Sequence, residues 1–195
     1  MTKRSDDTDI IEQIRSLFGQ RGGRSYGEQV TEQQHALQTA TFALQSNEDD
    51  SMIVACLLHD FGHLLHDLGE DVADHGVDSH HEQLGADTLE PFFPPQIVQP
   101  IRLHAEAKRY LCRNNTGYLE SLSAASRQSL VLQGGVMTQA DADAFESNRY
   151  FAEAVRLRRY DDKAKVVGMR TNTLESFLPR VARFVTEQSA VEKSG

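Results

Sequence analysis

The sequence has few of the features that mark secreted or membrane-spanning proteins. It contains only two cysteines in 195 residues, Cys56 and Cys112, which is too few for a disulfide framework. No apolar run approaches the length of about 18 residues that a membrane-spanning helix needs. The first residues turn acidic without an apolar stretch, which argues against a secretory signal. We therefore expect a cytoplasmic protein with no membrane partner.

Basic residues are also scarce. Lysine and arginine total 20 against 29 aspartates and glutamates, which gives a formal net charge of −9. Nucleic-acid binding needs a basic face, so this balance argues against a nucleic-acid partner. A small anion in a local positive pocket is still compatible with it. The length suggests a single domain over 1–195, with its core at about 25–185.

The spacing of apolar residues is helical almost throughout, and no convincing alternating strand is present. Thr31 and Gln34 fit a capping box. Residues 61–80 are rich in glycine and acid, which indicates a loop or lid. The pattern predicts an all-α, bundle-like fold. Helices are expected over 9–18, 31–46, 50–60, 81–90, from 94 past 108, 123–133, from 138, over 151–167 and from 173.

The pair His59-Asp60 ends the apolar run 52–58. Burying an imidazole and a carboxylate there is costly unless they are paired or bind a metal. A carboxylate can bridge two cations, and the neighbouring imidazole can bind one of them. The pair therefore calls for more ligands elsewhere in the chain. Candidates are His35, His81, His104 and Asp161.

Each of these histidines, taken alone, is more simply a surface or polar-face residue. Together they fall on, or at the end of, different expected helices, which is how helical bundles build metal sites. Four imidazoles and two carboxylates suit iron or manganese, and the thiolates of structural zinc sites are lacking. In this hypothesis Asp60 bridges the two metals, with one group on each side. His35, His59 and Asp161 complete one metal, and His81 and His104 complete the other. The open positions that are left indicate a catalytic site.

The order His35, His59-Asp60, Asp161 resembles the H…HD…D signature of the HD-domain superfamily, which is all-helical and consists mostly of metal-dependent phosphohydrolases. A closer similarity is to the PhnZ/TmpB-like group of mixed-valent di-iron oxygenases. It is carried by the segments LHDFGH (58–63), HEQLGA (81–86), RLHAEAKRYL (102–111), LQGG (132–135) and RRYD (158–161). The same motifs favour His81 over His80 and Asp161 over Asp162.

This resemblance implies an HD-domain bundle that holds an Fe(II)/Fe(III) pair. It also implies that His63, Lys108, Ser126 and Arg158 hold a phosphonate. Lys108 lies one helical turn after His104 and Arg158 one turn before Asp161, so both can reach an anion above the metals. The alternative for the charged helix 151–167 is an ordinary solvated face.

Glu28 would face the amine end of the substrate, and its simpler interpretation is a helix N-terminal acid. The group has a tyrosine three residues before this glutamate, where this chain has Ser25, so Tyr26 is one position off. A roomier pocket with an aromatic ring suits a quaternary ammonium, held partly by cation–π attraction. Asp60, Lys108 and Glu28 are the expected catalytic residues.

The implied function is O2-dependent cleavage of the C–P bond of 1-hydroxy-2-(trimethylammonio)ethylphosphonate to glycine betaine and phosphate. The substrate is a small zwitterionic phosphonate, and a homo-oligomer is possible. Four alternatives stay open: the same chemistry on 2-amino-1-hydroxyethylphosphonate, a metal-dependent HD phosphohydrolase, an oxygenase acting on a polyol, and a non-enzymatic metal-binding or interaction module.

Overall fold

The computed structural model describes residues 9–26, 29–65 and 80–186, and its secondary structure there is helical apart from one isolated bridge between Ser25 and Thr31. The helices are α1 (Ile10–Arg21), α2 (Glu32–Gln45), α3 (Asp50–Leu58), the 3-10 helix η1 (Phe61–Leu64), α4 (His81–Leu89), α5 (Pro95–Asn114), α6 (Thr116–Ser121), α7 (Ala124–Leu132), α8 (Gln139–Glu146), α9 (Phe151–Lys163) and α10 (Leu174–Ala182). The prediction of an all-α fold is confirmed.

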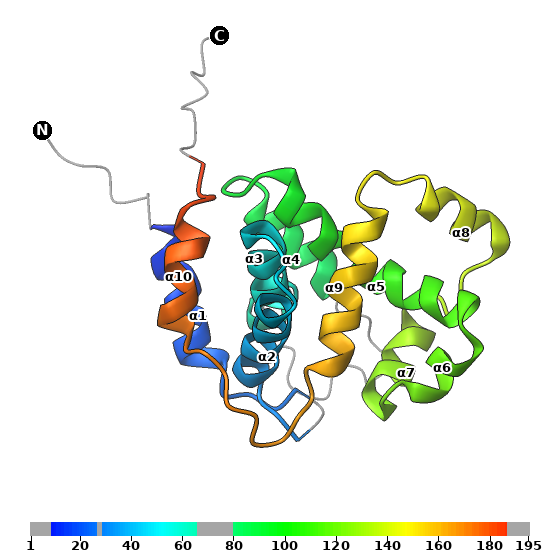
Figure 1. Cartoon of the computed structure of the whole chain (residues 1–195), viewed down its shortest axis with the longest axis horizontal. Helices are drawn as coiled ribbons and strands as arrows, with labels where there is room; N and C mark the ends of the chain where they lie inside the picture. Colours follow the sequence, from blue (N-terminus) through cyan, green and yellow to red (C-terminus); the bar gives the residue numbers. More distant parts are fainter. Residues whose placement is uncertain (1–8, 27–28, 66–79, 187–195) are drawn as a thin grey trace, which may run out of the picture.

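Helix α5 lies at the centre of the bundle and packs against α9, α4 and α3, while α2 packs against α3 and α9. Helices α1 and α10 lie together at one end, and α6, α7 and α8 lie at the other (Figure 1). The largest apolar cluster draws residues from α1, α2, α3, α4, α5, α9 and α10 and includes Cys56. Cys56 is fully buried and unpaired, as its place in the apolar run predicted.

Local capping explains where several helices begin. Thr31 accepts from the backbone N–H of Gln34, whose side chain accepts from the backbone of Thr31, so the predicted capping box is confirmed. Ser123 caps α7, which lies within the helix expected over 123–133. Asp49 caps α3, whereas the sequence suggested Asp50 or Ser51 for this cap. These bonds satisfy amide groups that have no partner within the helix.

Two helix ends differ from the sequence prediction. Helix α1 continues through Gly19 and stops at Gly22, where an added Cβ would lie 2.4 Å from the carbonyl oxygen of Phe18. Helix α9 ends at Lys163 and not near 167, and the carbonyl of Ala164 just after it accepts from His35 Nδ1 at 2.8 Å. Helix α6 was not expected from the sequence. Of the segment 61–80, predicted as a loop or lid, the first part forms the 3-10 helix η1, and residues 66–79 lie outside the described residues.

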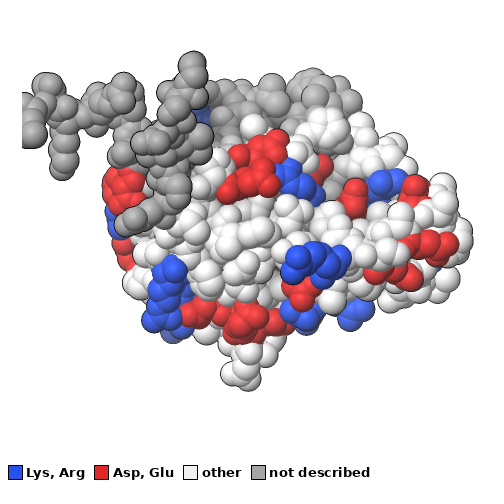
Figure 2. Space-filling view, turned by 90° about the horizontal axis from the view of Figure 1, so that it is seen from above, with Lys and Arg blue, Asp and Glu red and all other residues white. Residues whose placement is uncertain are grey.

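On the face shown in Figure 2, lysine and arginine side chains are interspersed with aspartate and glutamate among the described residues. Some charges of the described residues are paired, as in Arg102 with Asp87 and Arg180 with Asp50. No helix in the described part of the chain is both long and apolar enough to cross a membrane.

Candidate metal centre

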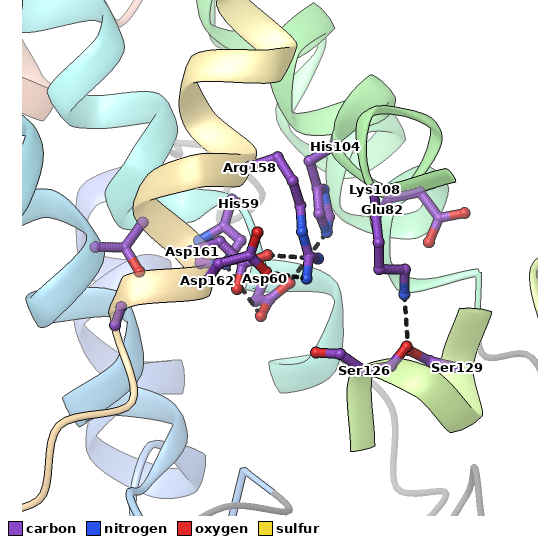
Figure 3. Close-up of polar contacts among 12 residues, drawn as sticks. His59, Asp60, Glu82, His104, Lys108, Ser126, Ser129, Arg158, Asp161 and Asp162 are labelled. Atoms are coloured by element: carbon purple, nitrogen blue, oxygen red, sulfur yellow. Dashed lines mark hydrogen bonds and ion pairs between the residues drawn. The ribbon is translucent and has the colours of Figure 1, made fainter. Parts of the chain in front are cut away.

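Six side chains meet where α2, α3, α4, α5 and α9 converge, four imidazoles and two carboxylates. Each is no more than 8% exposed, although all six are polar or ionisable. Figure 3 shows His59, Asp60, His104 and Asp161 directed toward one another. The six are His35, His59, Asp60, His81, His104 and Asp161. The structure therefore brings together every residue that the sequence suggested as a metal ligand.

Asp60 lies between two pairs of imidazoles. Its Oδ2 is 3.1 Å from His59 Nε2 and 3.4 Å from His35 Nε2. Its Oδ1 is 3.3 Å from His81 Nε2 and 3.5 Å from His104 Nε2. One group that could hold a metal ion consists of His35, His59 and Asp60. A second consists of Asp60, His81 and His104, so Asp60 belongs to both. This geometry is the one that a bridging carboxylate needs.

The imidazoles are oriented by what their other ring nitrogen contacts. His35 Nδ1, His59 Nδ1 and His104 Nδ1 donate to the backbone carbonyls of Ala164, Cys56 and Ile101 at 2.8, 2.9 and 2.7 Å. Assigning the proton to Nδ1 leaves Nε2 as the lone-pair atom that faces the centre. Such outer contacts fix ring orientation and raise the basicity of a metal ligand.

The fourth imidazole, His81, has a carboxylate near its Nδ1, since Glu82 Oε2 lies 3.5 Å away. Close packing between η1 and α4 sets the position of His81. A Cβ at Gly62 would lie 2.0 Å from the carbonyl oxygen of His81, and one at Gly85 would lie 2.9 Å from the nitrogen of Gly62. Glycine at both positions lets α4 approach closely enough to place His81 beside Asp60. His80 precedes the helix and is exposed.

Asp161 joins the centre from α9. Its Oδ1 lies 3.3 Å from His35 Nε2, and its Oδ2 pairs with Arg158 at 2.7 Å. The Asp162 carboxylate instead accepts hydrogen bonds from Arg158 and from the Tyr118 hydroxyl, each at 2.5 Å. The choice of Asp161 over Asp162 thus agrees with the geometry. Burial opposes ionisation of Asp161, but the Arg158 charge holds its pKa well below the usual range.

The centre has the marks of a cation site. Asp60 Oδ2 and Asp161 Oδ1 are buried and have no hydrogen-bond partner among the described residues. His35 Nε2 and His59 Nε2 are only 3.0 Å apart, and His81 Nε2 and His104 Nε2 are 3.2 Å apart. Ligand atoms bound at right angles, with metal bonds of about 2.1 Å, would be about 3.0 Å apart. A metal between each pair would satisfy atoms that are otherwise costly to bury.

Comparison with known proteins agrees with this centre. The HD-domain family model matches residues 33–144, which is more than half of the chain. The chain belongs to the HD-domain family. The matched range includes His59-Asp60, and the family resemblance seen in the sequence is confirmed.

Three relatives are similar to the chain over most of its length. A hydroxymethylphosphonate dioxygenase of Gimesia maris is 46% identical over 171 residues, 85% of each chain. A glycine-betaine-forming [1-hydroxy-2-(trimethylamino)ethyl]phosphonate dioxygenase of Leisingera caerulea is 41% identical over 177 residues, 90% of each chain. An uncharacterized protein of Acanthamoeba polyphaga mimivirus is 33% identical over 183 residues, 92% of this chain and 83% of the relative. The two dioxygenases support the predicted assignment to the oxygenases of this family.

Two further predicted residues flank the HD centre. The Tyr26 ring stacks on His35 with 3.7 Å between ring centres, and the His63 ring stacks on His81 at 4.1 Å. Desolvation of the Tyr26 hydroxyl and the nearby charge of Asp60 raise the pKa of Tyr26 well above its usual range. Tyr26 therefore covers a candidate ligand of one metal group, and His63 covers a candidate ligand of the other. Glu28 lies outside the described residues.

The predicted anion-binding residues also lie beside the centre. Lys108 extends from α5 to Ser129 on α7, where its Nζ donates to Oγ at 2.7 Å (Figure 3). Ser126, one turn earlier on α7, accepts from Lys165 at 2.9 Å. Arg158 is 4% exposed and donates from Nε to the Tyr118 hydroxyl at 3.1 Å, besides pairing with Asp161. All three predicted residues, Lys108, Ser126 and Arg158, are buried.

Sequence reasoning missed four residues beside this centre. Asp162 and Tyr118 form hydrogen bonds with Arg158. Ser129 accepts from Lys108, and Lys165 donates to Ser126. Lys165 had a usable signal, since it follows Asp161 by four residues just as Lys108 follows His104. Tyr118 gave no such signal, because it lies on α6, a helix that the apolar pattern did not predict.

The charge of Lys108 is expected to make the enzyme sensitive to pH. Burial, and next the Arg158 charge, lower the pKa of Lys108 to about 7. Lys108 is therefore charged below pH 7 and neutral above it, and only the charged form attracts an anion strongly. We expect kcat/KM for an anionic substrate to fall as pH rises through about 7, because this parameter reports the free enzyme.

The measurement is a pair of pH profiles, one for the wild-type chain and one for Lys108→Met. Dividing one profile by the other removes the ionisation of the substrate itself. The ratio should fall by up to about tenfold for each pH unit above 7. A ratio that stays constant with pH would contradict this role for Lys108.

Proposed function

We propose that this HD-domain protein cleaves the C–P bond of a 1-hydroxyphosphonate with O2. The observation that carries the proposal is the Asp60-bridged centre, with Lys108 and Arg158 beside it, in a chain 41–46% identical to two phosphonate dioxygenases. Each of those relatives is named for a 1-hydroxyphosphonate.

Two iron ions in the Fe(II)/Fe(III) state are the proposed metals. Nitrogen and oxygen donors without thiolates suit iron, and oxygenation requires a metal that changes its redox state. His35, His59 and Asp161 would hold one ion, His81 and His104 the other, and Asp60 both. When bound, the iron pair would supply O2 activation and oxidation of the substrate carbon.

The chain itself would supply orientation and charge. Two carboxylate ligands do not neutralise an Fe(II)/Fe(III) pair, so the centre keeps a positive charge that favours a dianion. Lys108 and Arg158 add to this charge and would hold the phosphonate oxygens, which directs the hydroxyl-bearing carbon toward the centre. Tyr26 and His63 cover ligand imidazoles and would limit access of water.

The reaction balances with one O2 for each phosphonate. The carbon that carries the hydroxyl and the phosphonate becomes a carboxylate, and the phosphonate becomes phosphate with release of one proton. The carboxylate keeps the hydroxyl oxygen and gains one oxygen atom. The phosphate keeps three oxygens and gains the other. Each product would therefore contain one atom from O2.

We propose first that the substrate carries a trimethylammonio group. It is supported by the Leisingera relative and by Tyr26, whose ring lies in the centre where an aromatic surface could contact a quaternary ammonium. Glycine betaine and phosphate would be the products. The free amine, giving glycine and phosphate, is the alternative for the same pocket.

Hydroxymethylphosphonate is a second candidate. The Gimesia relative that carries this name is 46% identical. In addition, the Lys165 ammonium lies over the Tyr26 ring, 6.0 Å from its centre, where it would repel a second cation. A substrate without an ammonium group avoids that repulsion.

The test is a panel of these three phosphonates with the iron-reconstituted protein, followed by oxygen uptake and phosphate NMR. The proposal predicts one phosphate for each O2 and, with labelled O2, one labelled oxygen in each product. The substrate with the highest kcat/KM identifies the substituent. Phosphate release from an ester under strict anaerobiosis, with no turnover of any hydroxyphosphonate, would instead establish an HD phosphohydrolase.

A further inference from the structure

Two lysines from distant parts of the chain approach the same turn of α7. Lys108 Nζ, from α5, donates to Ser129 Oγ at 2.7 Å, and Lys165 Nζ, from the segment after α9, donates to Ser126 Oγ at 2.9 Å. Ser126 and Ser129 are three residues apart on one helix, so their side chains are neighbours. The two ammonium groups therefore lie on one side of α7.

The contacts of these lysines leave their charges uncompensated. Both donate to neutral hydroxyls, and neither has a carboxylate of the described residues within ion-pair distance. Arg158 differs, since Asp161 and Asp162 both pair with it. The Lys165 charge is one of the causes that lower the pKa of Lys108, so the two cations interact. Like charges brought together in this way are stabilised when an anion lies between them.

Lys165 also lies close to the metal centre. Its Nζ is 6.0 Å from the centre of the Tyr26 ring, and that ring stacks on His35 at 3.7 Å. An anion that contacts Lys165 and Ser126 would thus lie within reach of the ligands of the HD centre. Ser126 is the third residue of α7, at the end of the helix whose dipole favours negative charge.

We propose that Lys165 is a substrate-binding residue that holds the phosphonate together with Lys108, each lysine beside one serine of the pair Ser126 and Ser129. This inference rests on the proposed function. Arg158 already pairs with Asp161 and Asp162, so Lys108 and Lys165 would add two cations that have no ion pair with a described carboxylate. Lys165 would thereby determine selection for a phosphonate over a neutral polyol.

The test is Lys165→Met, which keeps the length of the side chain and removes its charge. Losing a charge-assisted hydrogen bond is expected to raise KM about 10- to 100-fold, with kcat changed less than about threefold. The dissociation constant of inorganic phosphate, measured by dialysis with the iron-loaded protein, should rise by the same factor. Lys165→Arg should recover most of both losses.

Lys163→Met is the matched control, because Lys163 is exposed and its ammonium faces the Tyr160 ring, 5.9 Å from the ring centre. It should leave KM and phosphate binding unchanged. Iron content and thermal stability of Lys165→Met should equal those of the wild-type chain. Phosphate binding within twofold of wild type in Lys165→Met would overturn the inference. If no hydroxyphosphonate is turned over but phosphate binding still depends on Lys165, the proposed function fails and the anion site stands.

Discussion

Replacing Asp60 by asparagine is expected to abolish binding of both metals, and not of one alone. Each carboxylate oxygen of Asp60 faces its own pair of imidazoles, so the change weakens both groups together. Removing an outer partner of a metal ligand costs up to about 100-fold in affinity or activity, and the loss of a shared ligand should exceed that. Oxygen-dependent phosphate release should fall by more than about 100-fold.

The measurement is iron content after anaerobic reconstitution and removal of excess metal. A thermal shift gives a second readout, because metal that binds only the folded chain raises its melting temperature, and the variant should lose that rise. Asp143→Asn, an exposed carboxylate on α8, is the control and should bind as much iron as the wild-type chain. An Asp60→Asn protein that holds a full complement of iron would contradict the bridging role.

Replacing Arg158 by methionine is expected to destabilise the fold as well as the centre. The guanidinium of Arg158 pairs with Asp161 and Asp162 and donates to Tyr118, and it is 4% exposed. Its removal leaves buried carboxylate charge without its partner, which costs about 3–5 kcal/mol. For a chain of this size that corresponds to a fall in melting temperature of roughly 6–20 °C.

Arg159→Met provides the control, since Arg159 is the exposed neighbour of Arg158 on α9. It should change the melting temperature by no more than about 2 °C, as expected for a surface site. Iron binding to the Arg158→Met protein should also weaken, because Asp161 loses the contact that orients it. An Arg158→Met protein with the melting temperature of the wild-type chain would show that the Arg158 contacts contribute little to stability.

Local signals in the sequence predicted much of the helical framework. The capping box at Thr31 and the cap at Ser123 depend on neighbouring residues only, so they could be identified without a fold. The end of α9 could not be predicted in that way. Just after that end, the carbonyl of Ala164 accepts from His35, 129 residues away, a contact that no local pattern reveals. Helix α6 has only six residues and buries none of them, so no apolar period marks it.

The metal centre was predictable because its chemistry is unusual for buried positions. A histidine and an aspartate at the end of an apolar run need partners, and histidines on other expected helices could supply them. The resemblance to the HD family then selected His81 over His80 and Asp161 over Asp162, and the geometry agrees with both choices. Tyr118 was missed because only tertiary packing brings it to Arg158. Lys165 was missed although its spacing of four residues from Asp161 marked it.

The central claim is that this centre holds two metals joined by one carboxylate, and iron stoichiometry with Mössbauer spectroscopy tests it most directly. The protein would be loaded anaerobically with ferrous iron, freed of excess metal, and oxidised by one electron for each pair. The account predicts two irons per chain, one ferric and one ferrous, magnetically coupled through Asp60. A single iron per chain, or two irons without coupling, would contradict it.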